Sequence, residues 1–208
     1  MKIVCLGDSL TYGFGVSRSN SWTNIVNKET RLEIVNKGIN GDTTSGMLAR
    51  FNEDVVKNSP DIVFIMGGTN DFIAGAGNEI INSNIMAMVH QSYSKNIIPI
   101  IGIPLKPDIP NVRKDWSCFT DFNIVSQNLE SYSYWIKKFC MTFNTNFVDF
   151  YSEYNKNMEL EGYKKLYFDG LHPTKEGHRI MADIFINSIN KYIDCLLYTS
   201  DAADDSLR

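Results

Sequence analysis

The feature that most constrains the fold of this chain is a run of five apolar residues, Ile62-Val63-Phe64-Ile65-Met66, between Asp61 and a pair of glycines. A short run without polar alternation is typical of a strand that is covered on both faces of a parallel sheet. Four other short segments have strand-like composition, and they lie at residues 2–6, 32–36, 97–103 and 146–150.

Helical patterns lie between these strands. The clearest steps by fours and threes through Val125, Leu129, Tyr132, Ile136, Phe139 and Phe143. Strands that alternate with helices predict a doubly wound parallel sheet with right-handed crossovers. No internal repeat or linker interrupts this order, so we expect one domain over residues 1–194.

The last segment, residues 195–208, is treated separately. It resembles the translation of a sequencing adaptor rather than part of a domain. We therefore interpret it as a non-native tail and expect it to form no packed structural element.

Charge and hydropathy exclude several classes of partner. The formal net charge is −4 and no block of lysine or arginine is present, which disfavours nucleic acid and stable association with an anionic membrane. No apolar run approaches the ~20 residues of a membrane span. The opening run is too short for a signal peptide, so we expect a cytoplasmic location. The four cysteines form no CxxC pair, and Cys5 and Cys140 are expected to be buried packing residues.

Polar residues gather in four loop segments. Three follow the first three predicted strands, and the fourth precedes the last predicted helix. The carboxyl ends of parallel strands share one edge of the sheet, so these groups can converge there. The segments are Gly7-Asp8-Ser9-Leu10, Gly38 to Thr44, Gly68-Thr69-Asn70-Asp71 and Asp169-Gly170-Leu171-His172.

Together these loops contain the groups needed for acyl transfer through a serine. Ser9 would be the nucleophile and His172 the base that removes its proton. Asp169 would fix the histidine tautomer and stabilise the imidazolium. The backbone N–H groups of Gly41 and Ser9 and the side-chain amide of Asn70 would donate to the oxyanion.

In order and spacing the four segments resemble the SGNH hydrolases, also called the GDSL esterases and lipases. The resemblance covers residues 2 to about 193. It implies a flavodoxin-like three-layer α/β/α sandwich with a five-stranded parallel sheet. It also implies hydrolysis of ester or thioester bonds without a metal or cofactor.

Other polar residues have simpler interpretations. Asp8 and Asp71 are expected to hold loops through side-chain to backbone hydrogen bonds. His90 and His178 are expected to be ordinary helix residues. No spacing of histidines, cysteines or acids indicates a metal site.

Two aromatic segments could shape a pocket. The long connection at residues 104–122 and the segment at residues 151–168 are both expected to contact the substrate. Their large aromatic residues could be pocket wall or core, and the sequence does not decide between the two. They are Trp116, Phe119, Tyr163, Tyr167 and Phe168.

The expected partner is a small-molecule ester, but the natural substrate and the oligomeric state stay open. Lysophospholipase, acyl-thioesterase, aryl esterase and carbohydrate O-deacetylase activities all occur in the resembling family. An acyltransferase would use the same acyl-enzyme with another acceptor. A binding module without catalysis and metal-assisted hydrolysis are further alternatives.

Overall fold

The computed structural model describes the backbone of residues 1–161 and 166–205 and the side chains of residues 1–157 and 166–192. Within these residues five strands form one parallel sheet in the order β2-β1-β3-β4-β5. The predicted strands and the parallel α/β sandwich are therefore confirmed. The strands are β1 (Lys2–Gly7), β2 (Glu33–Gly38), β3 (Ile62–Met66), β4 (Ile98–Ile103) and β5 (Asn146–Asp149).

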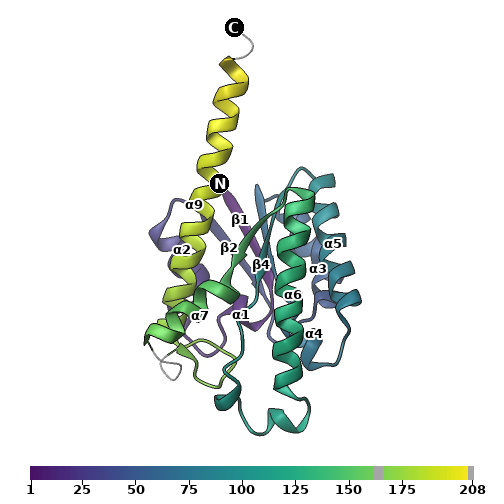
Figure 1. Ribbon diagram of the computed structural model, residues 1–208. Coiled ribbons are helices and arrows are strands. Elements are labelled where there is room, and N and C mark those ends of the chain that lie inside the picture. The colour runs from purple at the N-terminus through teal and green to yellow at the C-terminus, as the bar shows by residue number, and fades with distance from the viewer. Residues whose placement is uncertain (162–165, 206–208) are drawn as a thin grey trace.

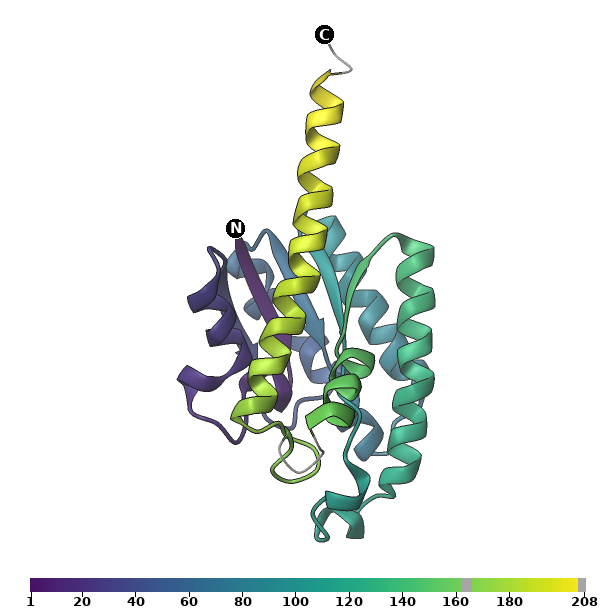
Figure 2. The same ribbon diagram turned by 60° about the vertical axis from the view of Figure 1, so that its left-hand side comes forward.

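Helices cover both faces of the sheet (Figures 1 and 2). One layer consists of α2 (Trp22–Glu29), α7 (Phe150–Glu161) and α9 (Lys175–Asp205). The other consists of α3 (Thr44–Asp54), α5 (Asn78–Ser94) and α6 (Phe122–Phe143). Two short helices, α1 (Ser9–Tyr12) and α4 (Thr69–Ile73), lie directly after strands. Single 3₁₀ turns are at Arg18–Asn20, Val56–Asn58, Ile109–Asn111 and Trp116–Cys118.

The strands supply both halves of the core because their side chains alternate between the two faces. Val4 and Leu6 of β1 pack on the side of α3, α5 and α6, whereas Ile3 and Cys5 pack on the side of α2, α7 and α9. Every residue of β3 is buried, as expected for a central strand. Cys5 and Cys140 are both buried in the core, which confirms their predicted packing role.

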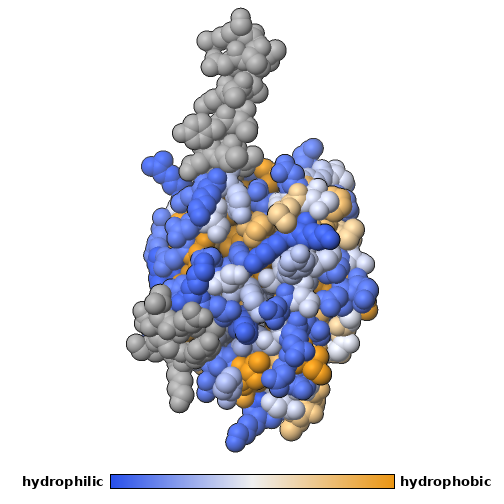
Figure 3. Space-filling view, viewed as in Figure 1, coloured by the Kyte–Doolittle hydropathy of each residue, from blue (hydrophilic) through white to orange (hydrophobic). Residues whose placement is uncertain are grey.

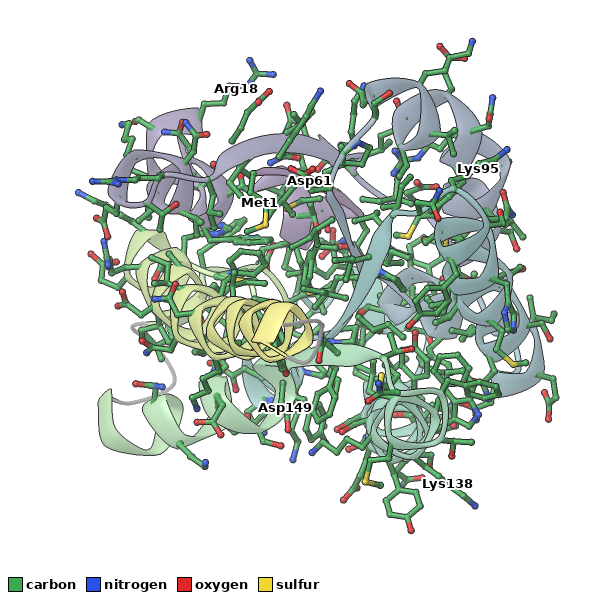
Figure 4. All side chains as sticks on the ribbon, turned by 90° about the horizontal axis from the view of Figure 1, so that it is seen from above. Met1, Arg18, Asp61, Lys95, Lys138 and Asp149 are labelled. Atoms are coloured by element: carbon green, nitrogen blue, oxygen red, sulfur yellow. The ribbon has the colours of Figure 1, made fainter. Side chains whose placement is uncertain are left out.

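The register brings three strands to an end at the same level. Gly7 of β1 lies opposite Gly38 of β2 on one side and Met66 of β3 on the other. Figure 4 views the opposite edge of the sheet, where the labelled Met1 and Asp61 precede β1 and β3. The loops that carry the candidate site residues therefore leave from the edge that faces away from the viewer.

Helix α7 is an element that the sequence pattern did not predict. Residues 151–161 show no clean helical period, and the strand-like composition of residues 146–150 predicts that Phe150 belongs to the preceding strand. In the structure Phe150 begins α7 and packs with Tyr154, one turn later, in the core beside Trp22. Two buried aromatic residues four positions apart thus supply tertiary packing that stabilises this helix.

The backbone of the C-terminal segment is helical as far as residue 205. Helix α9 continues through residues 195–205 instead of ending near residue 194, and its end projects beyond the rest of the molecule (Figures 1 and 2). The packing of this segment concerns side chains beyond those described, so the expectation that it forms no packed element stays a prediction. Extending an existing helix avoids the cost of nucleation, and the segment contains good helix formers such as Leu196 and Ala202. Its non-native origin stays a prediction.

Replacing Trp22 with alanine should destabilise the fold strongly. Trp22 is fully buried, its indole N–H donates to the Leu10 carbonyl at 2.9 Å, and its ring packs against Phe64, Phe150 and Phe185. We expect the free energy of unfolding to fall by about 3–5 kcal/mol, measured by denaturant titration.

A suitable control is Tyr134→Ala on α6, because that side chain is 74% exposed. The free energy of unfolding of this variant should stay within about 0.5 kcal/mol of the wild-type value. Equal losses in the two variants would contradict the packing described here.

Candidate active site

The loops after β1, β2 and β3 and the segment before α9 surround one cavity of about 310 Å³. Four of the predicted site residues line it. The lining residues are Ser9, Phe14, Asn40, Gly41, Asn70, Ile73, Trp116, Phe119, Phe122, Leu171 and His172. Asp169, the fifth predicted residue, contacts His172 from outside this lining.

Ser9 is the first residue of α1 and is only 8% exposed. The preceding Asp8 caps this short helix, because its Oδ1 accepts the Leu10 N–H at 2.9 Å. The strand-to-helix turn is tight at Gly7, where an added Cβ would lie 2.1 Å from Thr11 Oγ1 and 2.7 Å from the Met66 carbonyl oxygen. The turn thus fixes the position of the Ser9 hydroxyl at the edge of the sheet.

Three side chains form a continuous hydrogen-bonded line. Ser9 Oγ lies 2.9 Å from His172 Nε2, and His172 Nδ1 lies 2.8 Å from Asp169 Oδ2. Asp169 Oδ1 also accepts the backbone N–H groups of His172 and Leu171, at 2.7 and 3.0 Å. With the proton on Nδ1, the Nε2 lone pair faces the serine hydroxyl and can accept its proton.

The Asp169 carboxyl is held in its charged form. Burial alone would raise its pKa, but the hydrogen bonds from the His172 ring and backbone outweigh burial and lower the pKa. An ionised carboxylate beside Nδ1 favours the tautomer described above and would stabilise an imidazolium.

Gly41 occupies a turn that requires glycine. The Asp42 N–H donates to the Ile39 carbonyl at 3.2 Å, and Gly41 has a φ of +76°, whereas Asn40 before it is not among the residues with positive φ. This pattern is a type II β-turn with glycine at its third position. This turn places Gly41 in the lining of the cavity.

Asn70 reaches the cavity from the start of α4. Its Nδ2 donates to the Asp42 carbonyl at 2.9 Å. A side-chain amide nitrogen has two hydrogens, so this bond orients the group and leaves a second N–H for a ligand. The backbone of Asp42 therefore connects the Asn70 amide to the turn that contains Gly41.

The segment with Asp169 is held by the long connection before α6. Asp108 N–H donates to the Gly170 carbonyl at 2.8 Å, and Arg113 N–H donates to the Asp169 carbonyl at 3.2 Å. Gly170 has a φ of +82°, and an added Cβ would lie 2.4 Å from the Val112 nitrogen. A side chain at this position would separate the two segments.

Aromatic rings form much of the cavity wall. The Trp116 ring lies 5.8 Å from the His172 ring and the Phe14 ring lies 4.6 Å from it, measured between centroids. Of the two interpretations of these residues, pocket wall or core, the structure thus supports pocket wall for Trp116 and Phe119. Phe119 itself is 84% exposed. Figure 3 shows hydrophobic side chains gathering at the lower end of the molecule, where the 104–122 connection lies in Figure 1.

The other aromatic residues have different positions. Tyr167 is buried in the core beside α9, and Phe168 is half exposed against Phe14 and His172. Tyr163 lies outside the described residues. Sequence reasoning missed the wall residues Phe14 and Phe122, since nothing local distinguishes a pocket aromatic from a core one.

The remaining polar residues behave as predicted. Asp8 and Asp71 both accept backbone N–H groups, from Leu10 and Thr44 respectively. His90 lies exposed on α5, and His178 is buried on α9.

In the part of the chain that the structure describes, histidine, cysteine, aspartate and glutamate side chains do not gather in a group of three or more that could hold a metal ion. None of the described helices combines the length and the apolar character needed to cross a membrane.

Comparison with known proteins identifies relatives of this chain. The sequence profile of the GDSL-like Lipase/Acylhydrolase family matches residues 5–180. An acetylxylan esterase of Geobacillus stearothermophilus is 26% identical over 77% of this chain and 74% of its own length. An arylesterase of Vibrio mimicus is 34% identical over 56% of this chain, and the matched part spans 60% of that protein.

Solved structures share the fold. A lipolytic protein of the G-D-S-L family from Desulfitobacterium hafniense superimposes with a TM-score of 0.73 at 27% identity, over 88% of this chain and 96% of that one. A Geobacillus stearothermophilus acetylxylan esterase superimposes with a TM-score of 0.74 at 23% identity, over 90% and 93% of the two chains. Its structures include variants described as catalytic mutants, in which a histidine, an aspartate or a serine is replaced with alanine.

Asp8 should make stability depend on pH in an unusual direction. Burial, the largest cause, raises the pKa of its carboxyl from 3.8 to about 7. Between about pH 4 and pH 7 the folded protein then holds a proton that the unfolded chain has lost, so the free energy of unfolding falls as the pH rises. Asp8→Asn preserves the acceptor for Leu10 but cannot ionise, so the variant should gain stability over the wild type across this window. One unit of pKa is worth about 1.4 kcal/mol, so the gain is of the order of 4 kcal/mol.

Thermal unfolding at a series of pH values measures this difference. Asp121→Asn is the control, because Asp121 is exposed and the backbone and side-chain hydrogen bonds from Asn123 lower its pKa. The stability difference between Asp121→Asn and the wild type should decrease only as the pH falls below about 4, where Asp121 becomes protonated. Parallel stability profiles for wild type and Asp8→Asn would contradict the prediction.

Proposed function

Because this chain belongs to the GDSL-like Lipase/Acylhydrolase family and is a carboxylic ester hydrolase, we propose that it acts through an acyl-enzyme formed on Ser9. The observation that carries this proposal is the line from Ser9 Oγ through His172 to Asp169, with steps of 2.9 and 2.8 Å, at the wall of a cavity that Gly41 and Asn70 also line. In that arrangement nucleophile, base and oxyanion donors can all reach one carbonyl group.

In the first half of the reaction Ser9 Oγ attacks the ester carbonyl while His172 Nε2 takes the hydroxyl proton. Asp169 stabilises the imidazolium that results. The carbonyl oxygen becomes an oxyanion, which accepts hydrogen bonds from the backbone N–H groups of Gly41 and Ser9 and from the Asn70 amide. Collapse of this intermediate breaks the ester bond, and His172 gives its proton to the leaving alcohol.

In the second half water attacks the acyl-enzyme. His172 removes a proton from the water, the oxyanion forms again against the same donors, and Ser9 leaves with the proton held by His172. The products are a carboxylic acid and free enzyme. The catalytic mutants of the related acetylxylan esterase involve the same three residue types, which supports these roles.

The cavity wall favours substrates with an apolar group next to the ester. Phe14, Ile73, Trp116, Phe119 and Phe122 line it, and its volume is about ten times the ~30 Å³ share of a water molecule. The named relatives act on acetylxylan or aryl esters, and this wall agrees better with an aryl or short acyl ester than with a polar sugar inside the cavity. A panel of p-nitrophenyl esters from acetate to octanoate measures the preference.

Hydrolase and acyltransferase share the proposed acyl-enzyme and differ only in the acceptor. Product analysis with an added alcohol separates them, since a transferase would form the new ester in preference to the free acid. We propose that water is the main acceptor. The cytoplasmic location stays a prediction from the sequence, and cell fractionation tests it.

Ser9→Ala should reduce hydrolysis of p-nitrophenyl acetate by about 10⁶-fold and abolish labelling by a fluorophosphonate probe, because no nucleophile remains. Ser131→Ala on α6 is the matched control, since Ser131 is exposed and bonds only within its own helix. Full activity in the Ser9 variant would refute the proposed mechanism.

Asn70→Ala should lower kcat by ~10²–10³ through the loss of one oxyanion donor. We expect KM to change little, because the charge on the oxygen develops only in the transition state. Steady-state kinetics measure both constants. A loss confined to KM would show that Asn70 binds substrate and does not stabilise the oxyanion.

A further inference from the structure

The guanidinium group of Arg50, on α3, makes four hydrogen bonds and one further close contact with a carboxylate oxygen. Nε donates to Asp42 Oδ2 at 2.8 Å, and Nη2 lies 2.7 Å from the same oxygen. Nη2 also donates to the Gly7 carbonyl at 3.0 Å, and Nη1 donates to the Lys37 carbonyl at 2.9 Å. The fifth contact joins Nη1 to Asp54 Oδ2 at 2.7 Å. A single side chain therefore contacts four separate positions of the chain.

Two of these acceptors mark the ends of neighbouring strands. Gly7 is the last residue of β1 and lies two residues before Ser9, and Lys37 is the next to last residue of β2. Arg50 thus ties the end of the strand that carries the nucleophile to the end of the strand that leads to the Gly41 turn.

The contact with Asp42 extends this connection to the remaining oxyanion donors. Asp42 follows Gly41 in the type II turn, and its carbonyl accepts the Asn70 amide at 2.9 Å. Its carboxylate is bound by Arg50. The position of Asp42 therefore sets the spacing between the Gly41 N–H and the Asn70 amide, and Arg50 holds Asp42 in place.

Both charged groups are largely buried, since the side chains of Arg50 and Asp42 are 16% and 12% exposed. Such a pair is screened little by salt. The planar fork of arginine matches several acceptors at once, which the single ammonium of lysine cannot do. A lysine at this position would keep the charge but lose most of the geometry.

We propose that Arg50 is a positioning residue that sets the geometry of the oxyanion hole through Asp42 and the Gly7 carbonyl. It does not line the cavity and acts only through these groups. The inference rests on the proposed function of Ser9, Gly41 and Asn70. An oxyanion hole of this kind loses rate when its donors move by a fraction of an ångström, so loss of Arg50 should affect the transition state more than the bound substrate.

Arg50→Lys tests the proposal. We expect kcat for p-nitrophenyl acetate to fall by about 10- to 100-fold with KM little changed. Affinity for a boronic acid, which forms a tetrahedral anion on the serine, should fall in parallel with kcat. A merely structural role would change stability without this selective loss of affinity for the tetrahedral adduct.

Two further variants sharpen the test. Asp54→Asn is the matched control, because Asp54 contacts the same guanidinium but not Asp42, and its kcat should stay at the wild-type value. Asp42→Ala removes the linking carboxylate and should reproduce the loss seen in Arg50→Lys. The double variant Arg50→Lys with Asp42→Ala should lose less than the product of the two single losses, since both act through one contact.

The outcomes separate this inference from the function on which it rests. Wild-type kcat in Arg50→Lys, or an equal loss in Asp54→Asn, would overturn the role of Arg50 while Ser9→Ala remained inactive. Activity in Ser9→Ala would instead overturn the proposed function itself. If Arg50→Lys does not fold, as judged by thermal unfolding, the kcat and boronic acid measurements on Asp42→Ala decide the question.

Discussion

The site depends on one geometric constraint, which is that parallel strands β1, β2 and β3 end at the same level. Gly7 stands opposite both Gly38 and Met66, so the three loops that follow start side by side. Each loop then needs only a short turn to place its polar group at the edge of the sheet. The hydrogen bonds of the sheet, which is among the most rigid parts of a fold, thus fix where the loops that carry Ser9, Gly41 and Asn70 begin.

Much of this arrangement could be predicted from the sequence. The five strands and their parallel arrangement follow from short apolar runs that alternate with helical patterns, and the family follows from four polar segments, three after strands and one before the last helix. The convergence of Ser9, Gly41 and Asn70 follows because strand ends in a parallel sheet share an edge, whereas the place of His172 beside them follows from the resemblance to the family. These features are predictable since each depends on a local pattern plus a general rule of topology.

Other features depend on contacts between distant residues, and local pattern does not indicate them. Phe150 and Tyr154 stabilise α7 by packing in the core, although the segment shows no clean helical period. Arg50 resembles any other polar residue on an amphipathic helix. Its importance becomes visible only when the carbonyls of Gly7 and Lys37 and the carboxylate of Asp42 are seen to meet at its guanidinium.

The connection between β4 and α6 both holds the segment that contains Asp169 and forms part of the cavity wall. Its residues 108–113 hydrogen-bond the backbone of Asp169 and Gly170, and Trp116, just after them, forms cavity wall. A change that reshapes this part of the wall also moves the acid beside His172. Substrate range and catalytic rate are therefore mechanically coupled along this segment. Phe119 lines the cavity from the same connection but is largely exposed, so a change at that position can reshape the wall with less effect on Asp169.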